Sequence, residues 1–260
     1  MTTLLRIDHV SRRFGGYIAL NDASCEIVEG HVHALIGPNG AGKTTLFNIV
    51  SGVLRPTSGK LSFQGMDYTG SRPDKILTMG IARNFQQVRL VRGLSVLENV
   101  MIGAHARIDR GLIGNTAEFL GFAVAERAAR EKARMMLEFV DMAGSGEMQP
   151  DDLTLVDQRR LEIARALASD PRLLLLDEPA AGMNPTELNE LGALISRIQA
   201  NGLTVLLVEH HMRLVMSISD RITVLSAGNI IAAGPPKVIQ RDPAVIAAYL
   251  GNGDEPALSS

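Results

Sequence analysis

A run of nine residues around position 40 has the composition and spacing of a phosphate-binding loop. It follows a short apolar stretch at 32–36 that predicts a strand, and it leads into a helix predicted from about Lys43. Its glycines let successive backbone N–H groups converge on a phosphate, and the helix N-terminus adds positive potential. We expect Lys43 to reach the β- and γ-phosphates of a nucleotide and the Thr44 hydroxyl to ligate Mg²⁺; the alternative is a glycine-rich turn with a surface lysine. The loop consists of Gly37, Pro38, Asn39, Gly40, Ala41, Gly42, Lys43, Thr44 and Thr45.

Two acidic residues follow a second apolar run, at 173–176, which predicts a fully buried strand. Such a strand would deliver Asp177 from the core to a Mg²⁺ beside the phosphate loop. Glu178, next along the chain, is placed to polarise an attacking water as general base. Two adjacent acids could instead cap the next helix, but together with the Lys43 loop they predict a nucleoside triphosphatase.

The secondary structure that must position these residues is predicted to change along the chain, from strands near the N-terminus to helix in the middle. Segments 4–10 and 23–28 predict short strands on either side of a turn-rich stretch containing Gly15 and Gly16. Between 86 and 153 the pattern becomes helical, and Gly144 is a plausible C-cap. One face of that long helix carries Ala129, Ala133, Met136, Leu137 and Val140.

The last third of the chain alternates strand and helix. Asn184 and Pro185 start a helix, 204–208 predicts a strand, and 222–226 with 229–233 predicts a hairpin. Strands separated by helices indicate a mostly parallel sheet with helices on both faces.

Bulk composition agrees with an ordinary globular α/β protein of 260 residues, because 46% of the residues are hydrophobic and 21% are charged. The formal net charge of −2 weighs against nucleic acid as the main partner. A single cysteine, Cys25, excludes a disulfide within the chain and favours the cytosol. No stretch approaches the roughly 18–20 apolar residues of a membrane span, so at a membrane other chains would provide the membrane part.

The order of the motifs resembles that of the nucleotide-binding domains of ABC proteins. In that resemblance Phe14 stacks on adenine (Tyr17 is a weaker candidate), Gln86 ligates Mg²⁺ and senses a transmembrane partner, and His210 contacts the γ-phosphate. A packed aromatic side chain and a solvated loop amide are the alternatives for Phe14 and Gln86. A metal site at His210 and His211 is not expected, since adjacent histidines at a strand end rarely converge.

Four segments are similar to one branch, the ATP-binding subunits of importers for branched-chain amino acids and related small solutes. They are Phe-Gln-Gln-Val-Arg-Leu at 85–90, Arg-Leu-Glu-Ile-Ala-Arg-Ala at 160–166, Asp-Glu-Pro-Ala-Ala-Gly-Met-Asn-Pro at 177–185 and Glu-His-His-Met at 209–212. The ending at 242–251 fits this branch too. The resemblance covers about 4–251, nearly the whole chain.

This resemblance implies a single ABC ATPase domain over 1–251 and a flexible tail at 252–260. The domain would have a RecA-like P-loop α/β core, an N-terminal antiparallel β-subdomain and a helical subdomain inserted at about 92–165. ATP and Mg²⁺ would be its cofactors, with Thr44, Gln86 and Asp177 on the metal and Lys43, Glu178 and His210 in catalysis.

The implied partners are transmembrane permease subunits, a second ATP-binding subunit (a different chain or another copy) and a periplasmic binding protein. The implied location is peripheral, at the cytoplasmic face of the inner or plasma membrane. A lipid or polysaccharide exporter motor and a soluble non-transport ABC ATPase are the alternatives; the latter would need a long coiled coil, a second nucleotide domain or a basic stripe.

One segment departs from the family. Its Leu-Ser-Gly-Gly-Gln-like signature, at a helix N-terminus, aligns with Leu-Thr-Leu-Val-Asp at 153–157. Thr154 can replace the serine hydroxyl. Val156 stands where the family has the glycine that approaches the other subunit's γ-phosphate, and Asp157 adds a negative charge. This chain therefore lacks the glycine through which the family's signature approaches the γ-phosphate.

Overall fold

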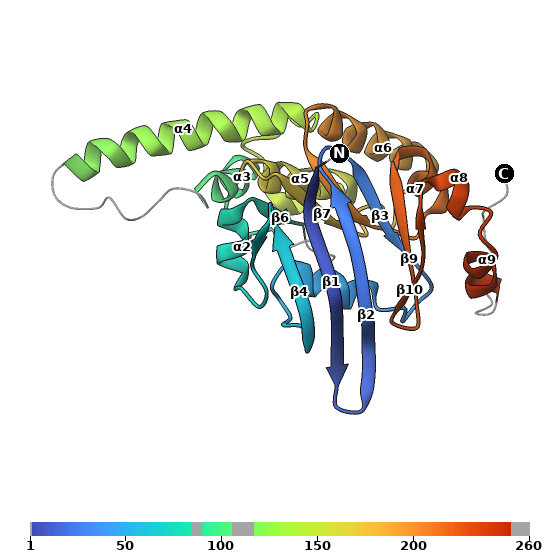
Figure 1. Cartoon of the computed structure of the whole chain (residues 1–260). Helices are drawn as coiled ribbons and strands as arrows, with labels where there is room; N and C mark the ends of the chain where they lie inside the picture. Colours follow the sequence, from blue (N-terminus) through green and yellow to red (C-terminus); the bar gives the residue numbers. More distant parts are fainter. Residues whose placement is uncertain (1, 85–89, 106–116, 251–260) are drawn as a thin grey trace. The chain divides into compact units, whose positions relative to one another are not determined.

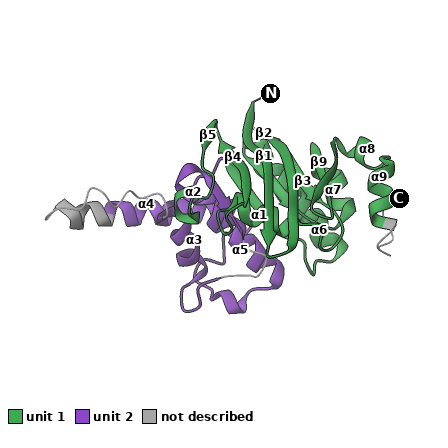
Figure 2. Cartoon of the chain, turned by 60° about the horizontal axis from the view of Figure 1, so that its bottom comes forward, with its two compact units in different colours: residues 1–76, 173–260 green, residues 77–172 purple. Residues whose placement is uncertain are grey.

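The computed structural model describes residues 2–84, 90–105 and 117–250. The chain divides into two compact units (Figure 2): unit 1 comprises Met1–Ile76 and Leu173–Ser260, and unit 2 comprises Leu77–Arg172. The helical segment expected at 92–165 falls within unit 2. The expected tail at 252–260 lies outside the described residues.

Unit 1 contains an antiparallel sheet near the N-terminus (Figure 1), with strand order β2-β1-β4-β5. Its strands are β1 (Thr3–Phe14), β2 (Tyr17–Val28), β4 (Ser58–Phe63) and β5 (Met66–Asp67). The prediction of short strands at 4–10 and 23–28 was wrong in extent, because both continue to the turn at Gly15 and Gly16. Register shifts between β1 and β2 let pairing continue through polar residues that break the apolar alternation.

The second sheet of unit 1 has the order β10-β9-β3-β8-β7. Its strands are β3 (Val32–Ile36), β7 (Leu173–Asp177), β8 (Thr204–Val208), β9 (Arg221–Ser226) and β10 (Asn229–Gly234). The four strands from β9 to β7 run parallel, and β10 returns antiparallel to β9. Every residue of β3, β7 and β8 is buried, as expected for parallel strands covered on both faces.

Helices cover these sheets within unit 1. Helix α1 (Lys43–Val50) contacts β2, β7 and β8, and α6 (Pro185–Ala200) packs on β8. The predicted start of α6 is correct: the Asn184 side chain accepts from the Thr186 and Glu187 N–H groups in a capping box. The short helices α7 (Met212–Ile218), α8 (Pro236–Ile239) and α9 (Pro243–Leu250) contribute to a core with β3 and β9. Helix α2 (Pro73–Met79) crosses the boundary between the units.

Unit 2 is mainly helical. It contains β6 (Ile81–Arg83), α3 (Val96–His105), α4 (Ala117–Phe139), a 3₁₀ turn η2 (Pro150–Asp152) and α5 (Leu155–Leu167). Helix α3 packs against α4 and α5, and a Cβ added at Gly103 would lie 1.9 Å from the Arg165 carbonyl oxygen. The glycine at this position therefore sets how closely α3 approaches α5.

The predicted C-cap of α4 at Gly144 is wrong. The helix ends at Phe139, and Asp141 takes the left-handed conformation with φ 63°. The N–H groups of Asp141 and Met142 bond the carbonyls of Glu138 and Leu137, which is a Schellman ending. Aspartate adopts the left-handed conformation more readily than most residues, because its short polar side chain can hydrogen-bond to the nearby backbone. A glycine is therefore not required at this helix end.

Candidate functional site

Three loops of unit 1 leave the parallel sheet at the same edge. In the sheet register Val208 of β8 pairs with Leu35 of β3 on one side and with Asp177 of β7 on the other. Because these strands run parallel, the segments that follow them emerge at one edge. The predicted phosphate loop, Asp177 with Glu178, and the segment containing His210 are thus brought to neighbouring strand ends.

The phosphate loop curls around the side chain of Lys43. The Lys43 Nζ donates to the carbonyl oxygens of Gly37 at 2.6 Å and Pro38 at 3.0 Å, and the residue is only 9% exposed. Gly40 of the same loop is exposed, and an added Cβ there would meet nothing within 4 Å. The loop therefore holds an ammonium group next to its own backbone, which suits a phosphate chain that binds both.

Two glycines of the loop are required by packing as well as by backbone conformation. A Cβ on Gly37, at φ 149°, would lie 2.0 Å from the Leu225 carbonyl oxygen of β9. A Cβ on Gly42, at φ 104°, would lie 2.6 Å from the Ala19 carbonyl oxygen of β2. The loop is thus held between strands of both sheets of unit 1.

Two of the three predicted metal ligands, Thr44 and Asp177, lie in the described part of the chain, and their side chains suit Mg²⁺. Thr44 is exposed in the first turn of α1, directly after Lys43, and Thr45 is half-buried. Asp177 is 1% exposed at the carboxyl end of β7. A hydroxyl and a carboxylate oxygen are hard ligands of the kind Mg²⁺ prefers. Gln86, the third predicted ligand, lies outside the described residues.

Glu178 occupies an unusual backbone conformation. Its φ is 47°, which is uncommon for a residue other than glycine. Its N–H bonds the Val208 carbonyl oxygen at 2.9 Å, and its own carbonyl accepts from the Ala181 N–H at 3.2 Å. These bonds continue the β7–β8 pairing into the turn and fix where the half-buried Glu178 leaves the sheet.

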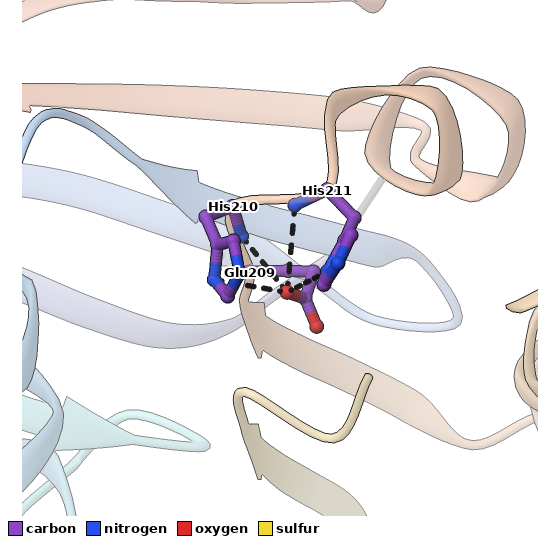
Figure 3. A group of neighbouring side chains, drawn as sticks. All are labelled: Glu209, His210 and His211. Atoms are coloured by element: carbon purple, nitrogen blue, oxygen red, sulfur yellow. Dashed lines mark hydrogen bonds and ion pairs between the residues drawn. The ribbon is translucent and has the colours of Figure 1, made fainter. Parts of the chain in front are cut away.

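The segment after β8 contains a residue that sequence reasoning missed. Glu209 is 1% exposed, and its Oε1 lies 2.9 Å from the His211 Nδ1 and 3.4 Å from the His210 Nδ1 (Figure 3). The signal was available, since Glu209 directly follows a buried strand, just as Glu178 does.

The expectation that the two histidines do not converge is also wrong. Their ring centroids are 4.3 Å apart, and with Glu209 they place three potential ligand atoms within 4.8 Å of one another. The chain turns here between β8 and α7, so successive side chains do not alternate as they would in a strand. The side chain of His210 is 58% exposed and that of His211 is 29% exposed.

The predicted adenine-stacking residue lies beside the turn between β1 and β2. Phe14 is 43% exposed, and the Cζ of Arg12 lies 4.5 Å from the centre of its ring. Tyr17, the weaker candidate, pairs with Phe14 across the turn and is 61% exposed. Neither aromatic side chain is buried in the core.

The segment that departs from the family signature begins α5 in unit 2. Thr154 is the N-cap: its Oγ1 accepts from the Asp157 N–H at 3.2 Å and donates to the Asp157 Oδ2 at 2.8 Å. The Arg160 Nη1 lies 3.7 Å from the Asp157 Oδ1. The Thr154 hydroxyl is therefore engaged by the carboxylate of its own helix.

Comparison with protein families identifies the chain. A family model described as ABC transporter matches residues 20–181, which include the phosphate loop and Asp177–Glu178. The chain belongs to the ABC transporter family. A second family model, described as branched-chain amino acid ATP-binding cassette transporter, matches residues 229–255.

Curated members of the ABC transporter family align with nearly the whole chain. The high-affinity branched-chain amino acid transport ATP-binding protein LivG of Salmonella typhimurium is 42% identical over 95% of this chain and 98% of its own length. The corresponding protein BraF of Pseudomonas aeruginosa is 41% identical over the same shares. The predicted membership of the ABC family is thus confirmed.

Solved ABC cassettes have the same fold. A nucleotide-free ATP-binding cassette from an ABC transporter matches 95% of this chain and 99% of its own, with 29% identity and a TM-score of 0.81. The ADP conformation of an ABC transporter cassette matches 96% and 100%, with 29% identity and a TM-score of 0.81. The predicted RecA-like α/β fold and nucleotide-binding ATPase class are confirmed. Among the described residues, no helix of this ABC ATPase is both long and apolar enough to cross a bilayer.

Proposed function

We propose that this ABC ATPase hydrolyses ATP to drive the import of branched-chain amino acids or related small solutes. The observation that carries the proposal is identity of 41–42% to LivG and BraF proteins over 95% of the chain. The carboxyl-terminal match to the branched-chain amino acid family model supports the same branch. The solute itself would not touch this chain, so the assignment rests on relatives rather than on a solute pocket.

In the proposed mechanism the phosphate loop binds the β- and γ-phosphates of ATP. Lys43 would exchange its bonds to the Gly37 and Pro38 carbonyls for bonds to phosphate oxygens. Thr44, Asp177 and Gln86 would hold Mg²⁺, which when bound neutralises charge on the β- and γ-phosphates. Phe14 would stack on the adenine ring.

Hydrolysis then requires an oriented water and a sensor of the γ-phosphate. Glu178 would accept a proton from the attacking water, and His210 would donate to the γ-phosphate oxygen. Both residues follow parallel strands that are direct neighbours, which supports their acting on the same phosphate.

We assign this chain the partners that its relatives' role requires. Transmembrane permease subunits would form the translocation path and hold this chain at the cytoplasmic face of the membrane. A periplasmic binding protein would deliver the solute. A second ATP-binding subunit would complete the composite ATP sites, and a chain different from this one fits the unusual signature segment better than another copy does.

Reconstitution tests this function directly. The chain would be assembled in proteoliposomes with its transmembrane permease subunits and a second ATP-binding subunit. We expect ATP-dependent uptake of labelled leucine, isoleucine or valine that Glu178→Gln abolishes and the exposed matched change Glu131→Gln leaves intact. ATP-driven efflux of a lipid, or uptake that ignores Glu178→Gln, would contradict the proposal.

Membrane attachment provides a second readout in the same system. We expect the chain to sediment with membranes only when the permease subunits are co-expressed. Stable membrane association of this chain alone would count against a peripheral location set by its partners.

A further inference from the structure

The carboxylate of Glu209 holds two loops together. Its Oε2 accepts from the Ala180 N–H at 3.1 Å, in the turn that follows Glu178. Its Oε1 accepts from the His210 N–H at 2.9 Å and the His211 N–H at 3.4 Å. One side chain thus bonds the backbone after β7 and the backbone after β8.

The imidazole rings add to this arrangement on the Oε1 side. Figure 3 shows both rings beside the carboxylate, with the His211 Nδ1 at 2.9 Å and the His210 Nδ1 at 3.4 Å. A carboxylate can only accept hydrogen bonds, so the bond with His211 requires the proton on Nδ1. The side chain of Glu209 has no exposed surface. Buried polar groups with several bonds of this kind fix local geometry, because each lost bond leaves a desolvated group unpaired.

A resident metal ion explains this cluster less well. Both carboxylate oxygens of Glu209 already accept backbone N–H groups, from Ala180 on one side and from His210 and His211 on the other. A cation bound to either oxygen would compete with those donors. The cluster is therefore better explained as a hydrogen-bonded support for its neighbours.

We propose that Glu209 is a positioning residue for ATP hydrolysis, whose carboxylate fixes His210 relative to Glu178. The inference rests on the proposed roles of Glu178 and His210. It adds that their relative placement depends on a third, buried group that does not touch the nucleotide. The bond between the Glu178 N–H and the Val208 carbonyl ties the same two segments on the strand side, so Glu209 supplies the matching tie on the loop side.

Glutamine is the informative substitution. Glu209→Gln is nearly isosteric but replaces one acceptor oxygen by an NH₂ donor. Whichever way the amide turns, that donor faces either the Ala180 N–H or the N–H groups of His210 and His211. One of the two loops must then move away, which disturbs catalysis more than ATP binding.

The test is a double-mutant cycle on the ATPase activity of the assembled transporter. We expect Glu209→Gln to lower kcat at least about tenfold with KM changed less than about twofold, and Glu131→Gln to leave both unchanged. In a His210→Ala background the same change should cost less than about threefold, because residues that act as a unit are not additive. An unchanged kcat, or an equal loss in both backgrounds, would overturn the proposal.

The variants separate this inference from the function beneath it. If His210→Ala lowers kcat and Glu209→Gln does not, only the role of Glu209 is refuted. If His210→Ala has no effect, the proposed role of His210 fails, and the positioning role fails with it.

A second pair of variants decides the matter if Glu209→Gln does not fold. His211→Asn retains a donor close to the position of Nδ1, whereas His211→Ala removes it. We expect the alanine variant to lose about threefold or more in kcat and the asparagine variant to recover most of it. Equal kcat values and equal melting temperatures for His211→Asn and His211→Ala would contradict the proposal, because the hydrogen bond from His211 to Glu209 would then contribute nothing to catalysis.

Discussion

At the scale of single residues, Lys43 and Glu178 should fail in different ways. Lys43→Ala removes the cation that would follow the charge on the β- and γ-phosphates, so it should weaken nucleotide binding and turnover together. Glu178→Gln keeps the shape of the side chain but removes the base, so it should retain ATP binding and lose about 10²–10⁴-fold in hydrolysis. Steady-state ATPase assays beside a nucleotide-binding measurement separate the two. A Glu178→Gln variant that hydrolyses ATP normally would show that the base is misassigned.

Sequence alone indicates a role for a residue when the motif around it implies the chemistry. It does not do so when the role depends on a contact that only the fold creates. Lys43 and Asp177 were proposed because a glycine-rich loop before a helix indicates a phosphate site and an acid at the end of a buried strand indicates a Mg²⁺ ligand. Glu209 was missed because its role depends on a contact with Ala180, and the register of β7 against β8 decides that contact. The short distance between the rings of His210 and His211 was likewise not predicted, since it depends on a turn that the hydrophobic periodicity of the sequence does not indicate.

At the scale of elements, the strands of the parallel sheet were predictable from sequence, and the extent of the first two strands was not. Apolar runs predicted β3, β7 and β8, because strands covered on both faces need continuous hydrophobic sequence. The first two strands were predicted too short, since polar residues such as Arg12 and Asp22 are typical of loops, yet the register shifts between β1 and β2 keep them paired or beside paired residues. The helix end at Asp141 was missed for a similar reason, because glycine is only the commonest residue for that conformation.

One buried residue of the central strand makes the stability of this element depend on pH. His33 of β3 is 1% exposed, and its Nε2 lies 2.8 Å from the Thr223 Oγ1 of β9. Burial, with smaller contributions from Arg221 and His31, lowers the pKa of His33 from 6.5 to about 3. Between these values the unfolded chain binds a proton that the folded chain does not. Stability therefore falls as pH drops below 6.5, by up to about 1.4 kcal/mol per pH unit.

His33→Gln should remove this contribution while its amide nitrogen keeps a bond to Thr223. We expect urea unfolding to show that wild type loses about 2 kcal/mol more than the variant when the pH is lowered from 7.5 to 5. The carboxylates titrate in both proteins and cancel in the comparison. If the free energy of unfolding fell equally with pH in the two proteins, the folded state would bind a proton at His33 as readily as the unfolded chain does, and the prediction would be wrong.

At the scale of the whole molecule, the unusual signature segment at 153–157 affects how ATP hydrolysis is divided between the two ATP sites of a pair of ATP-binding subunits. Val156 lies in the first turn of α5, and its β-branched side chain obstructs close approach of the backbone to a phosphate. The Thr154 hydroxyl already donates to the Asp157 carboxylate, which would also repel a phosphate placed nearby. The chain's own phosphate loop, Glu178 and His210 match the family pattern. Its ATP should therefore be hydrolysed against a partner's normal signature, and the reciprocal site should be weak.

This asymmetry predicts unequal effects of disabling the two sites in a heterodimer. Glu178→Gln in this chain, paired with a wild-type partner, should abolish most ATPase activity, while loss of the partner's equivalent glutamate should spare much of it. The double change Val156→Gly with Asp157→Gln removes the β-branched side chain and the negative charge, so it should raise the activity that survives Glu178→Gln. Equal losses from the two glutamate variants would refute the asymmetry. Strong ATP-driven homodimerisation of this chain alone would also refute it, because a homodimer would have to build both of its sites with the signature that contains Val156.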